Sequence, residues 1–335
     1  MTELKGKDFI SLKDFSREEL LHILDAAREL KGNSEPGAQV DMLKGRTLAM
    51  IFERPSTRTR VSMESAMTQL GGHAQYLDIK TMHYGGGVQP GVASMPAGGE
   101  PLADTYRVLA TYANGIYHRT TYAKGSHIAM VEGASLIDVP VINACDDYEH
   151  PCQILANLLT IREKKKKFEG LKLLFCGFPP ECHSFLWSAP KLGMDMITVI
   201  PEGCDSVIDK RTLEGAKDIA GKTGCRVDTS HDLFEAAHGV DIVYNAGGNN
   251  VFLEANPKLT VDDLEKRFTV NREVMGLAKP DAIYMHSMPA RRRPYYSWNE
   301  GGVTDEVIEG PQSVCIDLAE NRMHSAKGIL VSIIR

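Results

Sequence analysis

Short apolar runs alternate along the chain with segments whose apolar residues recur every three or four positions. The first pattern is typical of buried strands, and the second is typical of helices that cover a sheet. Strands are predicted at residues 46–52, 74–78, 115–118, 140–144, 171–176, 195–200, 241–245 and 282–286. Helices are predicted at residues 16–30, 58–70, 101–113, 151–165, 183–192, 208–222, 271–278 and 317–334. This alternation predicts an α/β fold with doubly wound parallel sheets.

The alternation pauses in a long helix that ends in "REKKKKFEG" and restarts near residue 171. A chain of 335 residues is long enough for about two domains, each with its own core. We therefore place the domain boundary in the helix that begins near His150. The first domain is predicted to span residues 1–149, and the second 150–315. The C-terminal helix, residues 316–335, is predicted to pack back on the first domain.

Composition and charge narrow the class of protein. The chain is 43% hydrophobic and 24% charged, as globular proteins are, and its net charge of −6 argues against a nucleic-acid binder. No apolar run is long enough to cross a membrane, and "MTELKGKDF" lacks the apolar core of a signal peptide. The seven scattered cysteines fit a reducing compartment. We expect a cytoplasmic protein with small-molecule substrates and neither nucleic-acid nor membrane partners.

The sequence does not match the motifs of several classes of cofactor enzyme. "GAKDIAGKT" at 215–223 resembles a phosphate-binding loop, but five residues separate its glycines where the motif needs four, and the pattern around it is helical. No G-x-G-x-x-G sequence follows a predicted strand. Cys176, Cys182 and His183 lie close in sequence without the second ligand pair of a zinc site. No metal and no organic cofactor is expected.

The run "FERPSTRTR" at 52–60 concentrates hydroxyl and guanidinium groups between a predicted strand and a predicted helix. The N-terminus of a helix offers free backbone N–H groups and a positive dipole end, which together favour an anion. The alternative is an ordinary Ser/Thr helix cap with two solvated arginines.

Three further stretches place polar groups at strand ends or helix starts. "YEHPCQ" puts His150 and Gln153 on one face at the start of a helix, although a lone histidine there is more often a cap or a core residue. "GIYHRTT" carries Arg119 at the end of a strand. "HSMPA" follows another strand, and its proline keeps the preceding residues extended, so their carbonyls can project into a cleft.

Taken in order, "FERPSTRTR", "GGEPLADTYRVLATY", "HPCQ", "HSMPA" and "AENR" resemble the aspartate/ornithine carbamoyltransferase family, over nearly the whole chain. The resemblance implies a carbamoyl-phosphate domain and an amino-acid domain, both doubly wound and linked by helices. It implies transfer of a carbamoyl group to an amine with release of phosphate. It further implies a homotrimer whose active sites lie at subunit interfaces.

The resemblance also implies roles for individual residues. The phosphate would be cradled by Ser56, Thr57, Arg58 and Thr59. The carbonyl oxygen and the oxyanion formed from it would be stabilised by Thr59, Arg119 and His150. The carbamoyl NH₂ group would donate to Gln153 and to the main-chain carbonyls of Ser287 and Met288. Arg322 would approach the phosphate or the carbonyl, and the peptide before Pro289 would be cis.

The acceptor is left open by the sequence. After "VDIVYN" the chain reads "AGGNNVFLE", without the Asp and Ser-Met-Gly of ornithine enzymes or the Arg and Gln of aspartate enzymes. Glu181, Cys182 and His183 stand where the family contacts a substrate carboxylate. "HSMPARRR" resembles the branch that uses N-acylated ornithine, but Thr57 departs from that branch. The candidate acceptor ligands, which alternatively form a polar loop over a domain edge, are Asn245, Asn249, Asn250, Arg291 and Arg292.

The sequence leaves three hypotheses about function. Transfer to ornithine or an ornithine derivative is favoured. An aspartate-type or other-amine carbamoyltransferase, or a non-catalytic carbamoyl-phosphate-binding regulator, remains as an alternative. The glycine- and proline-rich stretch at 84–101 is predicted to be a long loop, serving as a lid, as an arm to a neighbouring subunit, or as a tolerated insertion.

Overall fold

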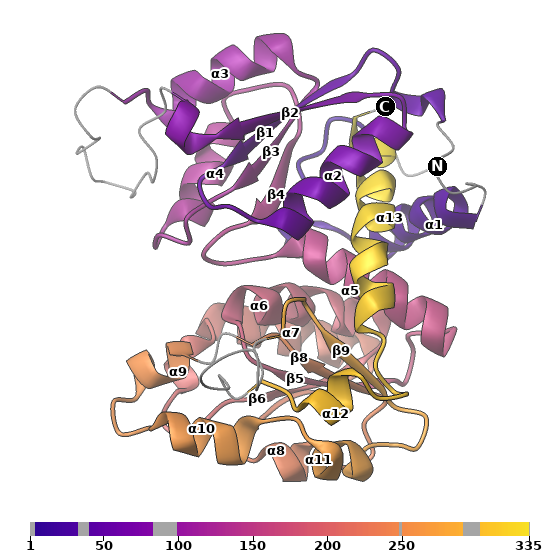
Figure 1. The fold of residues 1–335 in the computed structure, drawn as a ribbon, viewed down its shortest axis with the longest axis vertical. Helices are drawn as coiled ribbons and strands as arrows, with labels where there is room; N and C mark the ends of the chain where they lie inside the picture. Colours follow the sequence, from indigo (N-terminus) through magenta and orange to yellow (C-terminus); the bar gives the residue numbers. More distant parts are fainter. Residues whose placement is uncertain (1–3, 33–39, 83–98, 248–249, 291–301, 335) are drawn as a thin grey trace. The chain divides into compact units, whose positions relative to one another are not determined.

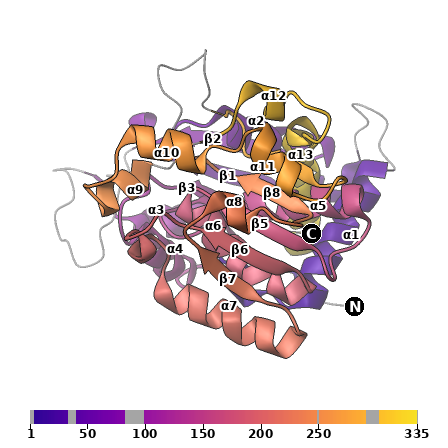
Figure 2. The ribbon, with the colours of Figure 1, turned by 90° about the horizontal axis from the view of Figure 1, so that it is seen from below.

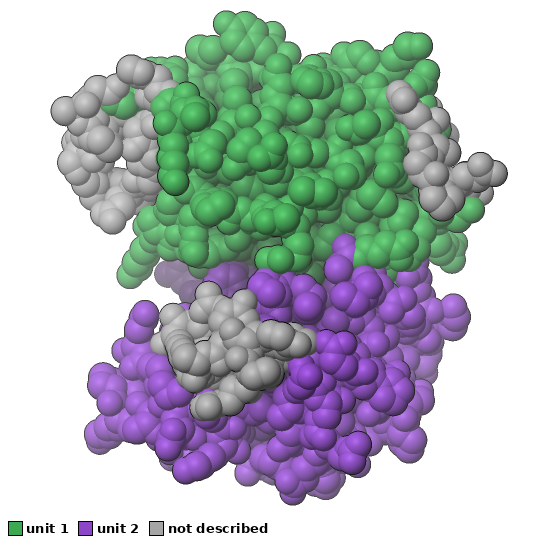
Figure 3. All heavy atoms as spheres, viewed as in Figure 1, with its two compact units in different colours: residues 1–159, 320–335 green, residues 160–319 purple. Residues whose placement is uncertain are grey.

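The computed structural model describes residues 4–32, 40–82, 99–247, 250–290 and 302–334. The chain forms two compact units: unit 1 holds residues 1–159 and 320–335, and unit 2 holds residues 160–319 (Figure 3). The division falls inside two helices, α5 (Pro151–Lys165) and α13 (Cys315–Ile333). The sequence analysis places the boundary in the helix that begins near His150, with the first domain at residues 1–149 and the second at 150–315.

Unit 1 is built on a four-stranded parallel sheet with strand order β2-β1-β3-β4 (Figure 1). Its strands are β1 (Thr47–Phe52), β2 (His73–Asp78), β3 (Gly115–Arg119) and β4 (Val141–Cys145). Its helices are α1 (Arg17–Gly32), α2 (Thr57–Gln69), α3 (Leu102–Tyr112) and α4 (Ser126–Ala134). Tyr106 of α3 and Met130 of α4 pack with Ile51, Ile116 and Val141 in one buried cluster, so these two helices cover one face of the sheet.

Unit 2 is built on a five-stranded parallel sheet with strand order β7-β6-β5-β8-β9 (Figure 2). Its strands are β5 (Lys172–Cys176), β6 (Asp195–Val199), β7 (Val227–Ser230), β8 (Ile242–Asn245) and β9 (Ile283–His286). Its helices are α6 (Pro179–Ser188), α7 (Lys210–Thr223), α8 (Leu233–Ala236), α9 (Asn250–Ala255), α10 (Val261–Phe268), α11 (Arg272–Leu277) and α12 (Asp305–Ile308).

Short 3-10 turns complete the secondary structure. They are η1 (Leu12–Asp14), η2 (Asp41–Leu43), η3 (Ile79–Thr81), η4 (Pro190–Leu192) and η5 (Asp205–Val207). Each sheet reverses its strand order once, between β1 and β3 in unit 1 and between β5 and β8 in unit 2. In open parallel sheets such reversals, at the carboxyl ends of the strands, are where ligands bind.

The α/β fold with parallel sheets is confirmed, and so are all eight predicted strands. The pattern missed β7, in which only Val227 is fully buried, because an edge strand with polar residues lacks an apolar run. It also missed the helices α4, α8, α9, α10 and α12. Helix α6 begins four residues before the predicted start, because two prolines occupy its first turn, where no backbone donor is needed.

Several smaller expectations can be compared with the structure. A capping box begins α1: the Glu19 N–H donates to Ser16 Oγ at 3.2 Å, and the Ser16 N–H donates to Glu19 Oε2 at 2.7 Å. Residues 215–223 lie within α7, as the rejection of a phosphate loop required. All seven cysteines are free thiols.

Across the described ranges, no group of His, Cys, Asp and Glu side chains is arranged to hold a metal ion. None of the helices within those ranges is long and apolar enough to cross a membrane.

Gly177 sets the geometry at the reversal point of unit 2. It links β5 to α6 with φ +117°, a backbone conformation that side chains disfavour. A Cβ atom on Gly177 would lie 2.6 Å from the carbonyl oxygen of Gly247, which follows β8. The start of α6 therefore lies directly against the chain that leaves β8.

Candidate functional site

The predicted phosphate motif joins β1 to α2 at the reversal point of unit 1. Ser56 is the N-cap residue of α2, but its Oγ bonds to Thr59 Oγ1 at 2.9 Å and caps no backbone N–H. No acidic residue occupies the first turn. The positive end of this helix therefore has neither a side-chain cap nor a carboxylate in its own first turn, an arrangement that suits an external anion.

The two arginines of the motif differ in their surroundings. The Arg60 guanidinium lies 3.7 Å from the centroid of the Tyr76 ring, and its Nε is 3.0 Å from Glu64 Oε1. Arg60 is thus held against β2 and α2 as a structural side chain. Arg58 is exposed in the first turn of the helix, where it can meet an anion.

Two arginines from different elements lie near His150 at the start of α5. Burial, together with the nearby cations Arg322 and Arg119, holds the pKa of His150 well below its usual value. His150 is 7% exposed, and Arg322 of α13 is 6% exposed. Arg119 ends β3 and donates to the hydroxyl of Tyr122. The imidazole is therefore neutral at physiological pH, so it can donate a hydrogen bond while the arginines carry the charge.

Gln153 is oriented by its own helix. Its Nε2 donates to Asn157 Oδ1 at 3.0 Å, one turn further along α5. Both side chains are buried. Because the amide nitrogen is committed to Asn157, the carbonyl oxygen is the end of Gln153 that can accept a hydrogen bond from a ligand.

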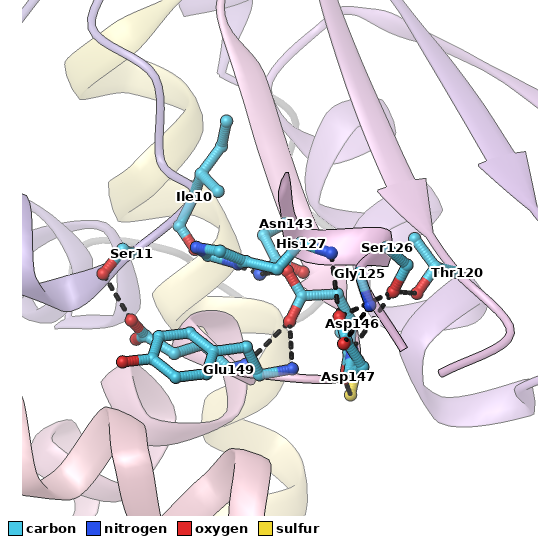
Figure 4. A network of polar contacts seen from close by, with 12 residues as sticks. Ile10, Ser11, Thr120, Gly125, Ser126, His127, Asn143, Asp146, Asp147 and Glu149 are labelled. Carbon is cyan, nitrogen blue, oxygen red and sulfur yellow. Dashed lines mark hydrogen bonds and ion pairs between the residues drawn. The ribbon is translucent and has the colours of Figure 1, made fainter. Parts of the chain in front are cut away.

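A buried network supports the turn that precedes His150 (Figure 4). Asp146 Oδ1 accepts from the backbone N–H groups of Tyr148 at 2.8 Å and Glu149 at 2.7 Å. Its Oδ2 accepts from Asn143 Nδ2 at 2.8 Å and from His127 Nδ1 at 2.6 Å. One carboxylate therefore ties together the end of β4, the start of α4 and the turn that enters α5.

Asp147 and His127 extend this network. Asp147 accepts from the backbone N–H groups of Gly125 at 2.7 Å and His127 at 2.8 Å, and from Ser126 Oγ at 2.9 Å. Burial alone would lower the pKa of His127, but the hydrogen bond and charge of Asp146 raise it. The start of α4 is thereby fixed to the loop that carries His150.

Glu149 anchors the other side of the same turn. Its carboxylate accepts from the backbone N–H of Leu12 at 3.1 Å and from the hydroxyl of Ser11. Burial raises the pKa of Glu149 to about 7, although these hydrogen bonds oppose the shift. The residue next to His150 therefore gains or loses a proton near neutral pH.

At the carboxyl edge of the sheet in unit 2, a second polar group surrounds Glu181. The hydroxyl of Tyr244 donates to Glu181 Oε2, and Ser287 Oγ donates to the same oxygen at 3.3 Å. His286 Nδ1 lies 2.7 Å from the main-chain oxygen of Ser287. The Met288–Pro289 peptide is cis, which confirms that expectation.

Of the five candidate acceptor ligands, the structure describes only Asn245 with its side chain. Asn245 is fully buried, and its side-chain amide forms hydrogen bonds with the main chain. Its Nδ2 donates to Gly302 O at 3.1 Å, and its Oδ1 accepts from the Gly247 N–H at 2.7 Å. Asn249, Arg291 and Arg292 lie outside the described residues, as does the side chain of Asn250. Most of the predicted loop at 84–101 also lies outside them.

Unit 1 therefore carries one group of the predicted site residues and unit 2 the other. Unit 1 carries Ser56, Thr57, Arg58, Thr59, Arg119, His150, Gln153 and Arg322, and unit 2 carries Asn245, Ser287 and Met288. Sequence reasoning missed the roles of Asn157, Tyr122 and Tyr244. Only Asn157 offered a signal, since it stands four residues after Gln153 in a helix.

The titration of Glu149 predicts how stability depends on pH. The folded-state pKa of Glu149 lies above the ordinary value of 4.5, so the folded protein holds this proton more tightly than the unfolded chain does. The stability that Glu149 contributes to the folded protein is therefore complete below about pH 4.5 and is lost as pH rises through about pH 7. This loss amounts to about 3 kcal/mol, in proportion to the pKa shift. We expect Glu149→Gln to remove most of it, measured by urea unfolding between about pH 5 and about pH 8. Glu132→Gln, an exposed change in α4, should keep the wild-type slope; an unchanged slope in Glu149→Gln would contradict the assignment.

Comparison with known proteins covers both units. The family model "Aspartate/ornithine carbamoyltransferase, carbamoyl-P binding domain" matches residues 7–163. Its companion, "Aspartate/ornithine carbamoyltransferase, Asp/Orn binding domain", matches residues 169–333. Ornithine carbamoyltransferase of Methanosarcina mazei is 38% identical over 330 residues, which cover 98% of this chain and 99% of that protein.

Solved structures agree with the sequence comparisons. Ornithine carbamoyltransferase from Pyrococcus furiosus superposes with a TM-score of 0.84 at 36% identity, covering 100% of this chain and 99% of that one. Acetylornithine transcarbamylase complexed with acetylcitrulline superposes with a TM-score of 0.83 at 29% identity, covering 98% and 99%. The family resemblance of the sequence motifs is confirmed. The chain belongs to the aspartate/ornithine carbamoyltransferase family and is a carbamoyltransferase.

Proposed function

We propose that this chain moves the carbamoyl group of carbamoyl phosphate to the amino group of a small amino-acid-type acceptor, with ornithine or an ornithine derivative favoured. The observation that carries the proposal is the pair of cations beside a neutral His150, in the same unit as the uncapped N-terminus of α2. This arrangement supplies both an anion site and donors for a polarised carbonyl group.

The phosphate is assigned to the start of α2. Backbone N–H groups and the hydroxyls of Ser56, Thr57 and Thr59 surround it, and Arg58 neutralises the charge that develops as phosphate leaves. Arg60 takes no part, because Tyr76 and Glu64 already hold it.

The carbonyl group is assigned to donors on three elements. Thr59, Arg119 and His150 donate to its oxygen and stabilise the oxyanion that forms when the amine attacks the carbonyl carbon. Arg322 contributes further positive charge near His150. These donors are fixed before the reaction, so little reorganisation is needed as the charge develops.

The carbamoyl NH₂ group is assigned to acceptors. Gln153 offers its carbonyl oxygen because Asn157 occupies its amide nitrogen. The main-chain carbonyls of Ser287 and Met288 complete the set. Once the C–N bond has formed, the bond from carbon to the phosphate oxygen breaks and phosphate leaves.

Ornithine is favoured because the compared proteins named as ornithine carbamoyltransferases match along both units. An N-acylated ornithine is the second candidate, since acetylornithine transcarbamylase superposes nearly as well. The seven free cysteines support a reducing compartment such as the cytoplasm.

We further propose a homotrimer with shared active sites. Helices α3 and α4 pack together and carry exposed apolar side chains, Val108 and Tyr112 on α3 and Ile128 and Val131 on α4, and the exposed Leu136 follows α4. A cluster of exposed apolar residues of this kind is typical of an interface between protein chains.

The acceptor is tested by measuring ureido product from carbamoyl phosphate with ornithine, N-acetylornithine, putrescine and aspartate. We expect turnover with ornithine or its N-acetyl derivative and none with aspartate. Aspartate as the best acceptor would replace the proposed substrate. Binding of carbamoyl phosphate without turnover of any amine would support a non-catalytic regulator instead.

The phosphate site is tested by comparing the two arginines of one motif. Arg58→Gln should lower kcat by about 10²-fold or more, because an interaction with the developing charge is lost. Arg60→Gln should keep kcat within a few-fold of the wild type. Steady-state phosphate release measures both variants, and equal losses in the two would contradict the assignment of Arg58.

The interface is tested by placing a charge on the apolar face. Ile128→Asp should shift the protein from three chains to one in sedimentation velocity and abolish activity, since a shared site is incomplete in one chain. Ile316→Asp is the matched control, because Ile316 is also exposed but lies on α13. A trimer that persists in Ile128→Asp would exclude this face as the contact.

A further inference from the structure

The contacts of Glu181 in unit 2 belong to no role assigned so far. Glu181 lies in the first turn of α6 and is only 3% exposed. Its Oε2 accepts hydrogen bonds from the hydroxyls of Tyr244 and Ser287, the latter at 3.3 Å. Two hydroxyl groups therefore donate to one oxygen of a buried carboxyl group.

The place of Glu181 in the fold is the reversal point of the sheet. Cys176 at the end of β5 pairs with Asn245 at the end of β8, which in turn pairs with His286 at the end of β9. Glu181 follows the first of these strands, and Ser287 follows the last. A buried carboxylate therefore stands at the edge where an open parallel sheet binds its ligands.

The neighbour of Glu181 connects it to the reaction. Ser287 is the residue whose main-chain carbonyl we assigned to the carbamoyl NH₂ group, and its hydroxyl points to Glu181. The acceptor amine must reach the carbamoyl carbon and must arrive there without its extra proton, because an ammonium ion has no lone pair. A carboxylate and a hydroxyl in contact form a route for that proton.

We propose that Glu181 forms, with Ser287, the subsite that receives the amino group of the acceptor. This inference rests on the proposed carbamoyl transfer. The subsite selects alkylamines that arrive as ammonium ions, since the carboxylate attracts that charge and repels an anionic group. Glu181 acts through Ser287 and is therefore a positioning residue that also accepts a proton.

The acceptor nitrogen loses two protons in the proposed step. One ammonium proton passes to Ser287 Oγ while the hydroxyl proton of Ser287 passes to Glu181 Oε2. The freed nitrogen forms a bond to the carbamoyl carbon, and the bond from that carbon to the phosphate oxygen breaks. The second proton of the nitrogen leaves with the phosphate, and Glu181 returns its proton to solvent.

Other titratable groups lie on β5, α6 and β9, and a change in their charge would also alter the pH profile of the reaction. Burial raises the pKa of Cys176 and of Cys182 to about 12, so neither thiol titrates in a neutral assay. His183 Nε2 accepts from the Asp209 N–H at 3.1 Å, and His286 Nδ1 contacts the Ser287 carbonyl. Both histidines are retained in every variant below, so a change in pH profile reports on Glu181.

The experiment measures kcat/KM for ornithine and for N-acetylornithine against pH in the wild type and in Glu181→Gln. We expect the variant to lose about 10²-fold near about pH 7.5, with KM for carbamoyl phosphate within about twofold. The loss should shrink at least about tenfold by about pH 9.5, where more of the amine is already neutral. A side chain that only held α6 in place would give a loss that does not change with pH.

Tyr244→Phe is the matched control, because it removes a hydrogen bond to Glu181 and leaves the carboxylate. It should lower kcat/KM by less than about fivefold, with the wild-type pH profile. Ser287→Ala should reproduce the pH-dependent loss of Glu181→Gln, since the relay hydroxyl is gone. Thermal unfolding of each variant checks that it is folded.

The outcomes separate this inference from the proposed function. An active wild type whose ratio to Glu181→Gln is the same at every pH, or is close to one, would overturn the amine subsite alone. A Tyr244→Phe profile identical to that of Glu181→Gln would do the same. Absence of ureido product from the wild type with every amine would overturn both proposals.

Discussion

The carboxylate of Asp146 is the interaction on which the geometry of unit 1 depends. It accepts four hydrogen bonds, from the end of β4, from α4 and from the turn that enters α5. A neutral imidazole beside two guanidinium groups is useful only if the chain cannot move it away from them. The tie from Asp146 removes that freedom, and Asp147 and Glu149 secure the segments on either side.

The two units carry opposite charges at corresponding places in their sheets. In unit 1, Arg58 follows β1 and Arg119 ends β3, the two strands at the reversal of strand order, and the pKa of His150 falls because burial and the charges of Arg322 and Arg119 disfavour a further positive charge. In unit 2, a buried carboxylate occupies the reversal point. Such a division suits a reaction between an anionic donor and a cationic acceptor, because each substrate is attracted to one unit and repelled by the other.

The sheets could be predicted from the sequence, and a candidate anion site could be named, because both depend on local patterns. Buried parallel strands are apolar runs, and the hydroxyl-rich start of α2 is contiguous at residues 56–60. The contacts of Glu181 could not be predicted, since Tyr244 and Ser287 are 63 and 106 residues away in sequence. Strand β7 was missed because an edge strand needs little apolar surface, and the hydrogen bonds of the Asn245 amide to the main chain leave no local signal in the sequence.

The loss of the family's familiar acceptor contacts need not mean the loss of an acceptor site. A carboxylate next to the reacting amine has the same effect whichever element supplies it, provided that its distance and its hydrogen bonds are similar. In our proposal α6 supplies it from the other side of the reversal point, and Gly177 lets the chain that enters α6 approach the chain after β8 closely. A search for the missing Asp at one position in the sequence would overlook this carboxylate. In the proposed subsite, acceptor specificity is therefore a property of three neighbouring strand ends, not of a single motif.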